Sequence, residues 1–141
     1  MTLNLMDKSN YLRGTILMNL KEDVISSKKY NMIEELGVLL GFNKNFIDKS
    51  LNNLFENKYI SKEPPKFSNV IFAEAFLRDC LKIALSDNDL QLDEIQWLWN
   101  VASLNSLSKQ WFYWELEDYL DHKDKISDPT YEVLKYILNK N

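Results

Sequence analysis

The chain has 141 residues and a formal net charge of −4, with 45% hydrophobic and 27% charged residues. This length fits one domain that buries its own core without disulfides or a structural metal, and the single cysteine excludes an internal disulfide framework. Three glycines and three prolines leave too little turn punctuation for an all-β fold. We therefore expect an all-α protein.

Apolar residues at helical spacing predict three helices in the first half of the chain. The first is expected over residues 9–21. The second follows Ser26, a good N-cap, and stops at Gly41, which supplies a left-handed residue. A third helix, capped by Asn43, completes a first unit over residues 9–58.

Pro64 and Pro65 mark a connector, because their missing amide donors and fixed backbone angles disfavour a helix. After it we expect a second unit over residues 68–120, with Ser108 as the cap of its last helix. The three helices of this unit are predicted over residues 68–85, 92–104 and 108–120.

A closing helix is predicted over residues 128–140. It would start at Asp128 with Pro129 in its first turn, where proline is tolerated. Apolar residues at helical spacing, such as Tyr131 and Leu134, give it one apolar face. We expect this face to pack across the bundle.

The second unit repeats the first at a shift of 65 residues, and internal repetition is a strong signal of architecture. Residues 1–141 are therefore interpreted as a single domain, a helical bundle of two pseudo-repeated three-helix units plus a C-terminal helix. Identical pairs include Leu12 and Leu77, Arg13 and Arg78, Leu20 and Leu85, Leu39 and Leu104, Lys44 and Lys109, and Leu51 and Leu116.

The junction between the first two helices of the second unit carries a recognisable pattern. A helix ends at Ala84, Asp87 follows in an acidic loop, and Glu94 opens the next helix. This pattern resembles the signature of the TerB-like family, helical proteins associated with tellurite resistance. Asn88 stands where the family has glycine, and Asn also tolerates left-handed geometry. Residues 101–108 are similar to the family's next helix end and turn.

The resemblance implies an all-helical signalling or scaffold module of bacterial stress and phage-defence systems, with divalent-cation binding through the acidic loop. The predicted function is therefore a non-enzymatic interaction or sensing module. In the first unit, Lys28 and Lys29 stand where the second unit has Asp93 and Glu94. Any cation site should belong to the second unit alone.

Four carboxylates form the predicted metal site, and hard cations such as Ca²⁺ or Mg²⁺ prefer such oxygen ligands. In a competing interpretation, the two at the helix start complement the helix dipole and the two in the loop bond to loop amides. That interpretation describes a pure protein-interaction adaptor without a metal. The four predicted ligands are Asp87, Asp89, Asp93 and Glu94.

All four tryptophans lie in the second unit. Trp97 and Trp111 follow the core spacing and are expected to be buried. Trp99 and Trp114 fall off the main apolar stripes. An exposed Trp beside acidic residues is suited to hold a basic partner peptide, so these two residues are the predicted partner-binding site.

Charge is uneven, with a net +2 over residues 1–66 and −6 over residues 67–141. An acidic surface repels phosphate backbones, so we expect no nucleic-acid partner for the second half. An alternative treats residues 31–67 as a winged-helix DNA-binding element with Lys44 and Lys49 facing DNA. The absence of an Arg or Asn cluster on its recognition helix counts against this alternative.

The sequence carries no phosphate-binding glycine loop and no nucleophile elbow. His122 lies in a charged run and Cys80 in an apolar helix, where we expect a core thiol. We therefore do not expect an enzyme. The chain also lacks a signal-peptide pattern and an apolar run of about 20 residues, so we expect a cytoplasmic protein without a membrane span.

Overall fold

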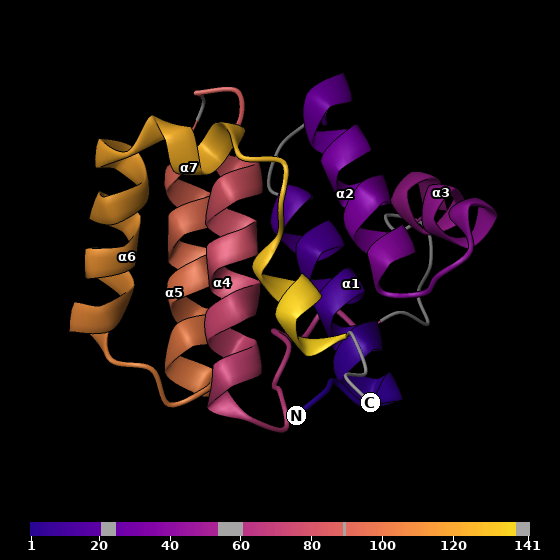
Figure 1. Cartoon of the computed structure of the whole chain (residues 1–141), viewed down its shortest axis with the longest axis horizontal. Coiled ribbons are helices and arrows are strands. Elements are labelled where there is room, and N and C mark those ends of the chain that lie inside the picture. Colours follow the sequence, from indigo (N-terminus) through magenta and orange to yellow (C-terminus); the bar gives the residue numbers. More distant parts are fainter. Residues whose placement is uncertain (21–24, 54–60, 89, 138–141) are drawn as a thin grey trace.

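The computed structural model describes residues 1–20, 25–53, 61–88 and 90–137. Within these residues the chain forms seven α-helices and one short 3-10 helix, η1, and no strand (Figure 1). The prediction of an all-α fold is confirmed. The helices are α1 (Leu5–Asn19), α2 (Ser27–Leu39), α3 (Lys44–Asn53), α4 (Val70–Ala84), α5 (Leu92–Leu104), α6 (Lys109–Asp121), α7 (Lys123–Ser127) and η1 (Glu132–Tyr136).

The helices form two groups of three that meet through α1 and α4. Helix α1 contacts α2, α4 and α5, while α4 also contacts α2, α5 and α6. In Figure 1, α4, α5 and α6 stand side by side, and α2 and α3 lie beyond α1. Helices α1, α2 and α3 begin at Leu5, Ser27 and Lys44, and α4, α5 and α6 each begin 65 residues later.

Two predicted N-caps and one predicted helix stop are confirmed by the local backbone geometry. Ser26 accepts from the backbone N–H of Lys29 at the start of α2, and Ser108 accepts from that of Trp111 at the start of α6. Gly41 has a φ of 96°, in the left-handed region that its role as a helix stop requires. Helix α1 begins four residues earlier than predicted because Asn4 forms a capping box at its start.

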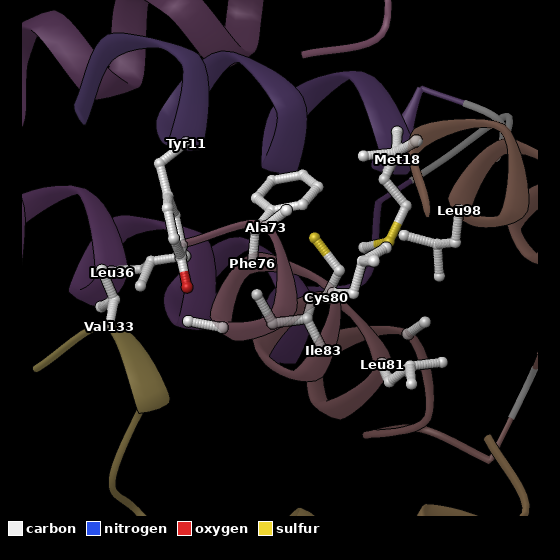
Figure 2. Packing of buried hydrophobic residues seen from close by; sticks show 14 of the residues in the cluster. Tyr11, Met18, Leu36, Ala73, Phe76, Cys80, Leu81, Ile83, Leu98 and Val133 are labelled. Atoms are coloured by element: carbon white, nitrogen blue, oxygen red, sulfur yellow. The ribbon is translucent and has the colours of Figure 1, made fainter. Parts of the chain in front are cut away.

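Aromatic and aliphatic side chains of both groups share one core. The rings of Tyr11 on α1 and Phe76 on α4 meet edge to face, with centroids 5.2 Å apart. Figure 2 shows both rings in one cluster with Cys80 of α4 and Val133 of η1. Cys80 is fully buried, as expected for a core thiol, and burial raises the pKa of this thiol well above its ordinary value.

The prediction of a closing helix from residue 128 is wrong in its start and its type. Residues 128–131 are not helical, and the ordered turn that follows is the 3-10 helix η1. A separate short helix, α7, precedes it. Residues 138–140 of the predicted helix, like residues 54–58 at the predicted end of the third helix, lie outside the described residues.

Contacts with α4 explain this difference. In an α-helix starting at residue 128, the carbonyl of Asp128 would accept from the N–H of Glu132. That carbonyl instead accepts from Nζ of Lys82, and the N–H of Glu132 donates to Oδ1 of Asp79 at 2.8 Å. The side chain of Asp128 also accepts from the N–H of Thr130 at 2.8 Å. Side chains of α4 therefore take the groups that an α-helix would have paired internally.

Candidate functional site

The acidic loop, residues 85–91, joins α4 to α5. Asn88 has a φ of 60°, so this position adopts the left-handed geometry for which the sequence pattern has glycine or asparagine. Asp93 and Glu94 lie in the first turn of α5, where a carboxylate also complements the positive end of the helix dipole.

The ammonium of Lys29, on α2, lies between two of the predicted metal ligands. Its Nζ is 3.6 Å from Oδ1 of Asp87 and 3.7 Å from Oε1 of Glu94. The side chains of Lys29 and Glu94 are 0% exposed, and that of Asp87 is 26% exposed. Beside them, Nζ of Lys28 donates to the carbonyl of Ser86 at 2.9 Å. The start of α2 thus supplies two cations to the acidic loop.

The four predicted metal ligands do not all converge. Asp87 and Glu94 meet at Lys29, Asp93 is exposed to solvent, and Asp89 lies outside the described residues. Within residues 1–20, 25–53, 61–88 and 90–137, no group of three or more His, Cys, Asp or Glu side chains is arranged to hold a metal ion.

The burial of Lys29 and Glu94 makes this ion pair costly to break. Removing one partner of a buried pair leaves a desolvated charge, which typically costs several kcal/mol. A divalent cation that used both Asp87 and Glu94 would have to approach an ammonium that already contacts both. The repulsion between these like charges opposes that approach.

A second buried carboxylate, Asp79 on α4, lies against the first group of helices. Its Oδ2 accepts from the hydroxyl of Tyr11 at 2.6 Å and from the N–H of Val133 at 3.1 Å, and its Oδ1 accepts from the N–H of Glu132. Burial raises the pKa of Asp79 to about 6, although these three hydrogen bonds act in the opposite direction. The same burial, together with the nearby charge of Asp79, raises the pKa of Tyr11, which therefore remains a neutral donor.

A polar cleft of about 470 Å³ opens between α4, α6, α7 and the segment that carries η1. Four basic and five acidic side chains line it, and Trp114 of α6 lies on its exposed side. This volume falls within the range of small-molecule and peptide side-chain sites. Its lining is more charged than that of a typical small-molecule pocket, which favours recognition of a charged group.

Two cations of the cleft are each paired with a carboxylate and lie over a ring. Arg78 donates to Oε1 of Glu115 at 2.9 Å and lies over the ring of Trp111, with Cζ 5.6 Å from its centroid. Lys125 pairs with Asp118 and lies over Tyr119. The pairing with Lys125 is the largest cause that lowers the pKa of Asp118, so this carboxylate carries its charge at neutral pH.

The two predicted partner-binding tryptophans occupy different environments. Trp114 is 62% exposed and lines the cleft. Trp99 is partly buried, and its ring lies 6.1 Å from that of Phe112, a core residue. The cleft therefore includes Trp114 and not Trp99. Of the two residues expected to be buried, Trp97 is buried, at 7% exposed, whereas Trp111 is only half-buried.

In the sequence, Lys29 was noted only because it stands where the second unit has Glu94. Asp79 and Lys82 were not predicted to be functional residues. The available signal was a charge inside an otherwise apolar helix, because Asp79 and Lys82 interrupt the apolar run of α4. Such a charge is buried only when it has partners. The partners come from residues 11 and 128–133, which no local pattern connects to α4.

Comparisons with protein-family models, with curated proteins and with solved structures give no match for this chain. Among the helices that the structure describes, none combines the length and the apolar character needed to cross a membrane.

Proposed function

We propose that the chain is a TerB-like interaction module built from two equivalent helical units. The equal 65-residue shift of three successive helix starts supports this organisation. So do contacts between residues that the shift makes equivalent, because the ring of Tyr11 packs on that of Phe76, and Lys29 pairs with Glu94. Equivalent residues meet in this way when a two-fold axis passes between two units.

In this proposal the module works without a bound metal, and Lys29 acts as the resident cation of the acidic loop. Its ammonium contacts Asp87 and Glu94, the two acidic positions of the TerB-like pattern. The ammonium of Lys29, which is part of the chain itself, thereby holds the acidic loop and the start of α5 to α2. Divalent-cation sensing stays the rival function, and it predicts that an added ion competes with Lys29.

The observation that carries the binding function is Trp114 at the exposed side of the charged cleft. An exposed tryptophan is a frequent centre of protein interfaces, since its ring buries a large area at low entropic cost. The cations lining the cleft include Arg78 and Lys125, which already pair with carboxylates, and acidic side chains outnumber basic ones there. A partner segment with Lys or Arg fits this surface, because its cation can lie over the free face of Trp114.

No catalytic role is part of this proposal. The thiol of Cys80 is buried with a raised pKa, which makes it a poor nucleophile. His122 lies at the exposed junction of α6 and α7, where it contacts Asp118. A role in bacterial stress or defence follows from the TerB-like resemblance and stays a prediction, as does the cytoplasmic location expected from the sequence.

A peptide array tests the proposed binding surface directly. Short peptides of graded net charge, with and without Arg or Lys beside apolar residues, are probed with the parent chain and with Trp114→Ala. We expect the parent to bind basic peptides and Trp114→Ala to lose most of that signal. Leu92→Ala is the matched control, because Leu92 is 76% exposed and lies on α5, outside the cleft.

Equal binding by the parent and Trp114→Ala, or no preference for basic peptides, would contradict the proposal. A labelled DNA duplex on the same array tests the winged-helix alternative. Salt-sensitive duplex binding that is lost in a Lys44→Ala, Lys49→Ala chain would favour that alternative instead.

A further inference from the structure

The C-terminal strap, residues 128–136, lies across the seam between the two groups of helices. In Figure 1 this yellow segment descends from α7 and passes between α4 and α2. It contacts residues of both groups, since Tyr131 reaches the carbonyl of Met32 on α2 and the strap amides reach Asp79 on α4. The strap therefore occupies a groove that both groups form.

The groove holds the backbone of the strap as a receptor holds a peptide. Asp79 accepts the N–H groups of Glu132 and Val133, while Lys82 donates to the carbonyls of Asp128 and Thr130. At the far end, the N–H of Leu3 donates to the carbonyl of Tyr136 at 2.9 Å. These hydrogen bonds join residues outside the strap to backbone groups of the strap. A strap that is not covalently linked to this bundle could therefore form them too.

Two side chains of the strap fill buried positions in the groove. Val133 is fully buried and Tyr131 is 6% exposed. The ammonium of Lys82 lies 5.2 Å from the ring centroid of Tyr131, and the ring of Tyr136 packs against Phe72 at 5.6 Å. An aromatic residue and a β-branched residue two positions later thus form the side-chain pattern that the groove accepts.

The link between the bundle and the strap is a short surface helix, held to α6 by the pairing of Lys125 with Asp118. Helix α7 has five residues, none of them buried, and it is the segment that would have to swing for the strap to leave. Exchange of such a terminal segment between identical chains is a low-cost route to a dimer, because the exchanged contacts are the same in both states.

We propose that this groove is a peptide-binding site and that the strap of a second copy of this chain binds there in exchange for the chain's own strap. The groove is already occupied by the chain's own strap. A second copy of the chain carries the same strap, which can make the same backbone and side-chain contacts. The proposal rests on the seam of the bundle and not on Trp114. The strap also forms one wall of the cleft beside Trp114, so exchange would supply that wall from the second copy.

A labelled peptide of residues 128–137 is the direct probe of the groove. In the parent chain the attached strap competes with the peptide, so we expect weak binding by fluorescence anisotropy. In the full chain carrying Val133→Thr, the groove is unchanged but its own strap is weakened, and we expect about tenfold tighter peptide binding because more grooves are free. Adding Lys82→Met to that chain should abolish the gain.

Mixing two full-length variants tests whether the strap of one chain binds in the groove of another. A Lys82→Met chain has a defective groove and an intact strap, and a Val133→Thr chain has the reverse. After joint warming and cooling, light scattering on a sizing column should show a heterodimer that neither variant forms alone. Circular dichroism of each variant first establishes that it is folded.

Three results would overturn the proposal. The first is a folded Val133→Thr chain that binds the peptide no better than the parent. The second is peptide binding that survives Lys82→Met. The third is a mixture that contains only monomers. If the variants do not fold, exchange is measured on two differently labelled samples of the parent chain, where absence of energy transfer after joint warming has the same meaning.

Discussion

Two buried carboxylates of the second half of the chain are compensated in different ways. Asp79 is held by three neutral donors, the hydroxyl of Tyr11 and the N–H groups of Glu132 and Val133. Glu94 is held close to the ammonium of Lys29, at 3.7 Å. In both cases a side chain of the first group of helices, on α1 or α2, contacts a buried carboxylate of the second group.

The difference between the two sites determines what each responds to. Neutral donors leave the charge of Asp79 uncancelled, so burial raises its pKa to about 6 and the site responds to protons. At Glu94 the compensating group is itself a cation, so its charge opposes the approach of another cation. The contrast teaches that one seam carries a proton-sensitive contact and a contact that, in the proposed function, takes the place of a bound metal.

The largest expected effect comes from removing the ammonium at the second site. Lys29→Met keeps a chain of similar length but leaves two carboxylates without their nearest cation. We expect the free energy of unfolding to fall by about 3 to 5 kcal/mol, as for other buried pairs that lose one partner. Urea unfolding followed by circular dichroism measures this change.

Lys44→Met is the matched control for that substitution. Lys44 also pairs with a glutamate, Glu34, at 3.6 Å, but its side chain is 67% exposed. Exposed pairs contribute little, so this variant should unfold at nearly the parent's urea concentration. Equal destabilisation by the two substitutions would show that burial does not govern the Lys29 pair.

The second prediction concerns pH. Because the pKa of Asp79 is about 6 in the folded chain, above its ordinary value of 3.8, the folded chain holds a proton between these values that the unfolded chain releases. The free energy of unfolding should therefore contain a component that is largest below pH 3.8 and falls by about 3 kcal/mol as the pH rises through 6.

Asp79→Asn removes that component, because an amide does not titrate. Urea unfolding of both chains from about pH 4 to about pH 8 isolates it as the difference between the two curves. The parent should lose stability relative to Asp79→Asn as the pH rises. Parallel curves would refute the assignment of a raised pKa to Asp79.

A smaller effect is expected for Tyr11→Phe, which deletes one donor to Asp79 and keeps the ring. A phenylalanine already occupies the equivalent position, Phe76, so the ring itself fits the core. Loss of a hydrogen bond to a buried charged group should cost about 2 kcal/mol near neutral pH. The cost should shrink at acidic pH, where Asp79 is neutral, and a cost that is independent of pH would contradict this explanation.

Local signals predicted what local contacts determine. Ser26, Ser108 and Gly41 occur where the backbone needs a cap or a left-handed residue, and helix α5 has the bounds that the apolar spacing predicted. The left-handed geometry of Asn88 likewise belongs to its own turn.

Contacts between distant segments explain what the sequence did not reveal. The strap is not an α-helix because Asp79 and Lys82, about 50 residues away, take its amides and carbonyls. The acidic loop was recognised as a cluster of carboxylates, but the pairing of Lys29 with Glu94 requires that α2 lie against the start of α5. Charge patterns along a chain do not specify such packing.

The most direct test of the central claim, that Lys29 takes the place of a metal, is thermal unfolding with added Mg²⁺ or Ca²⁺ after chelation. The parent chain, Lys29→Met and Lys29→Met with Glu94→Gln are compared. Binding to the folded state raises the unfolding midpoint by mass action. The account predicts no rise for the parent, a rise for Lys29→Met, and none once Glu94 is also replaced. A rise for the parent that Asp87→Asn with Glu94→Gln abolishes would contradict it and establish a cation site beside Lys29.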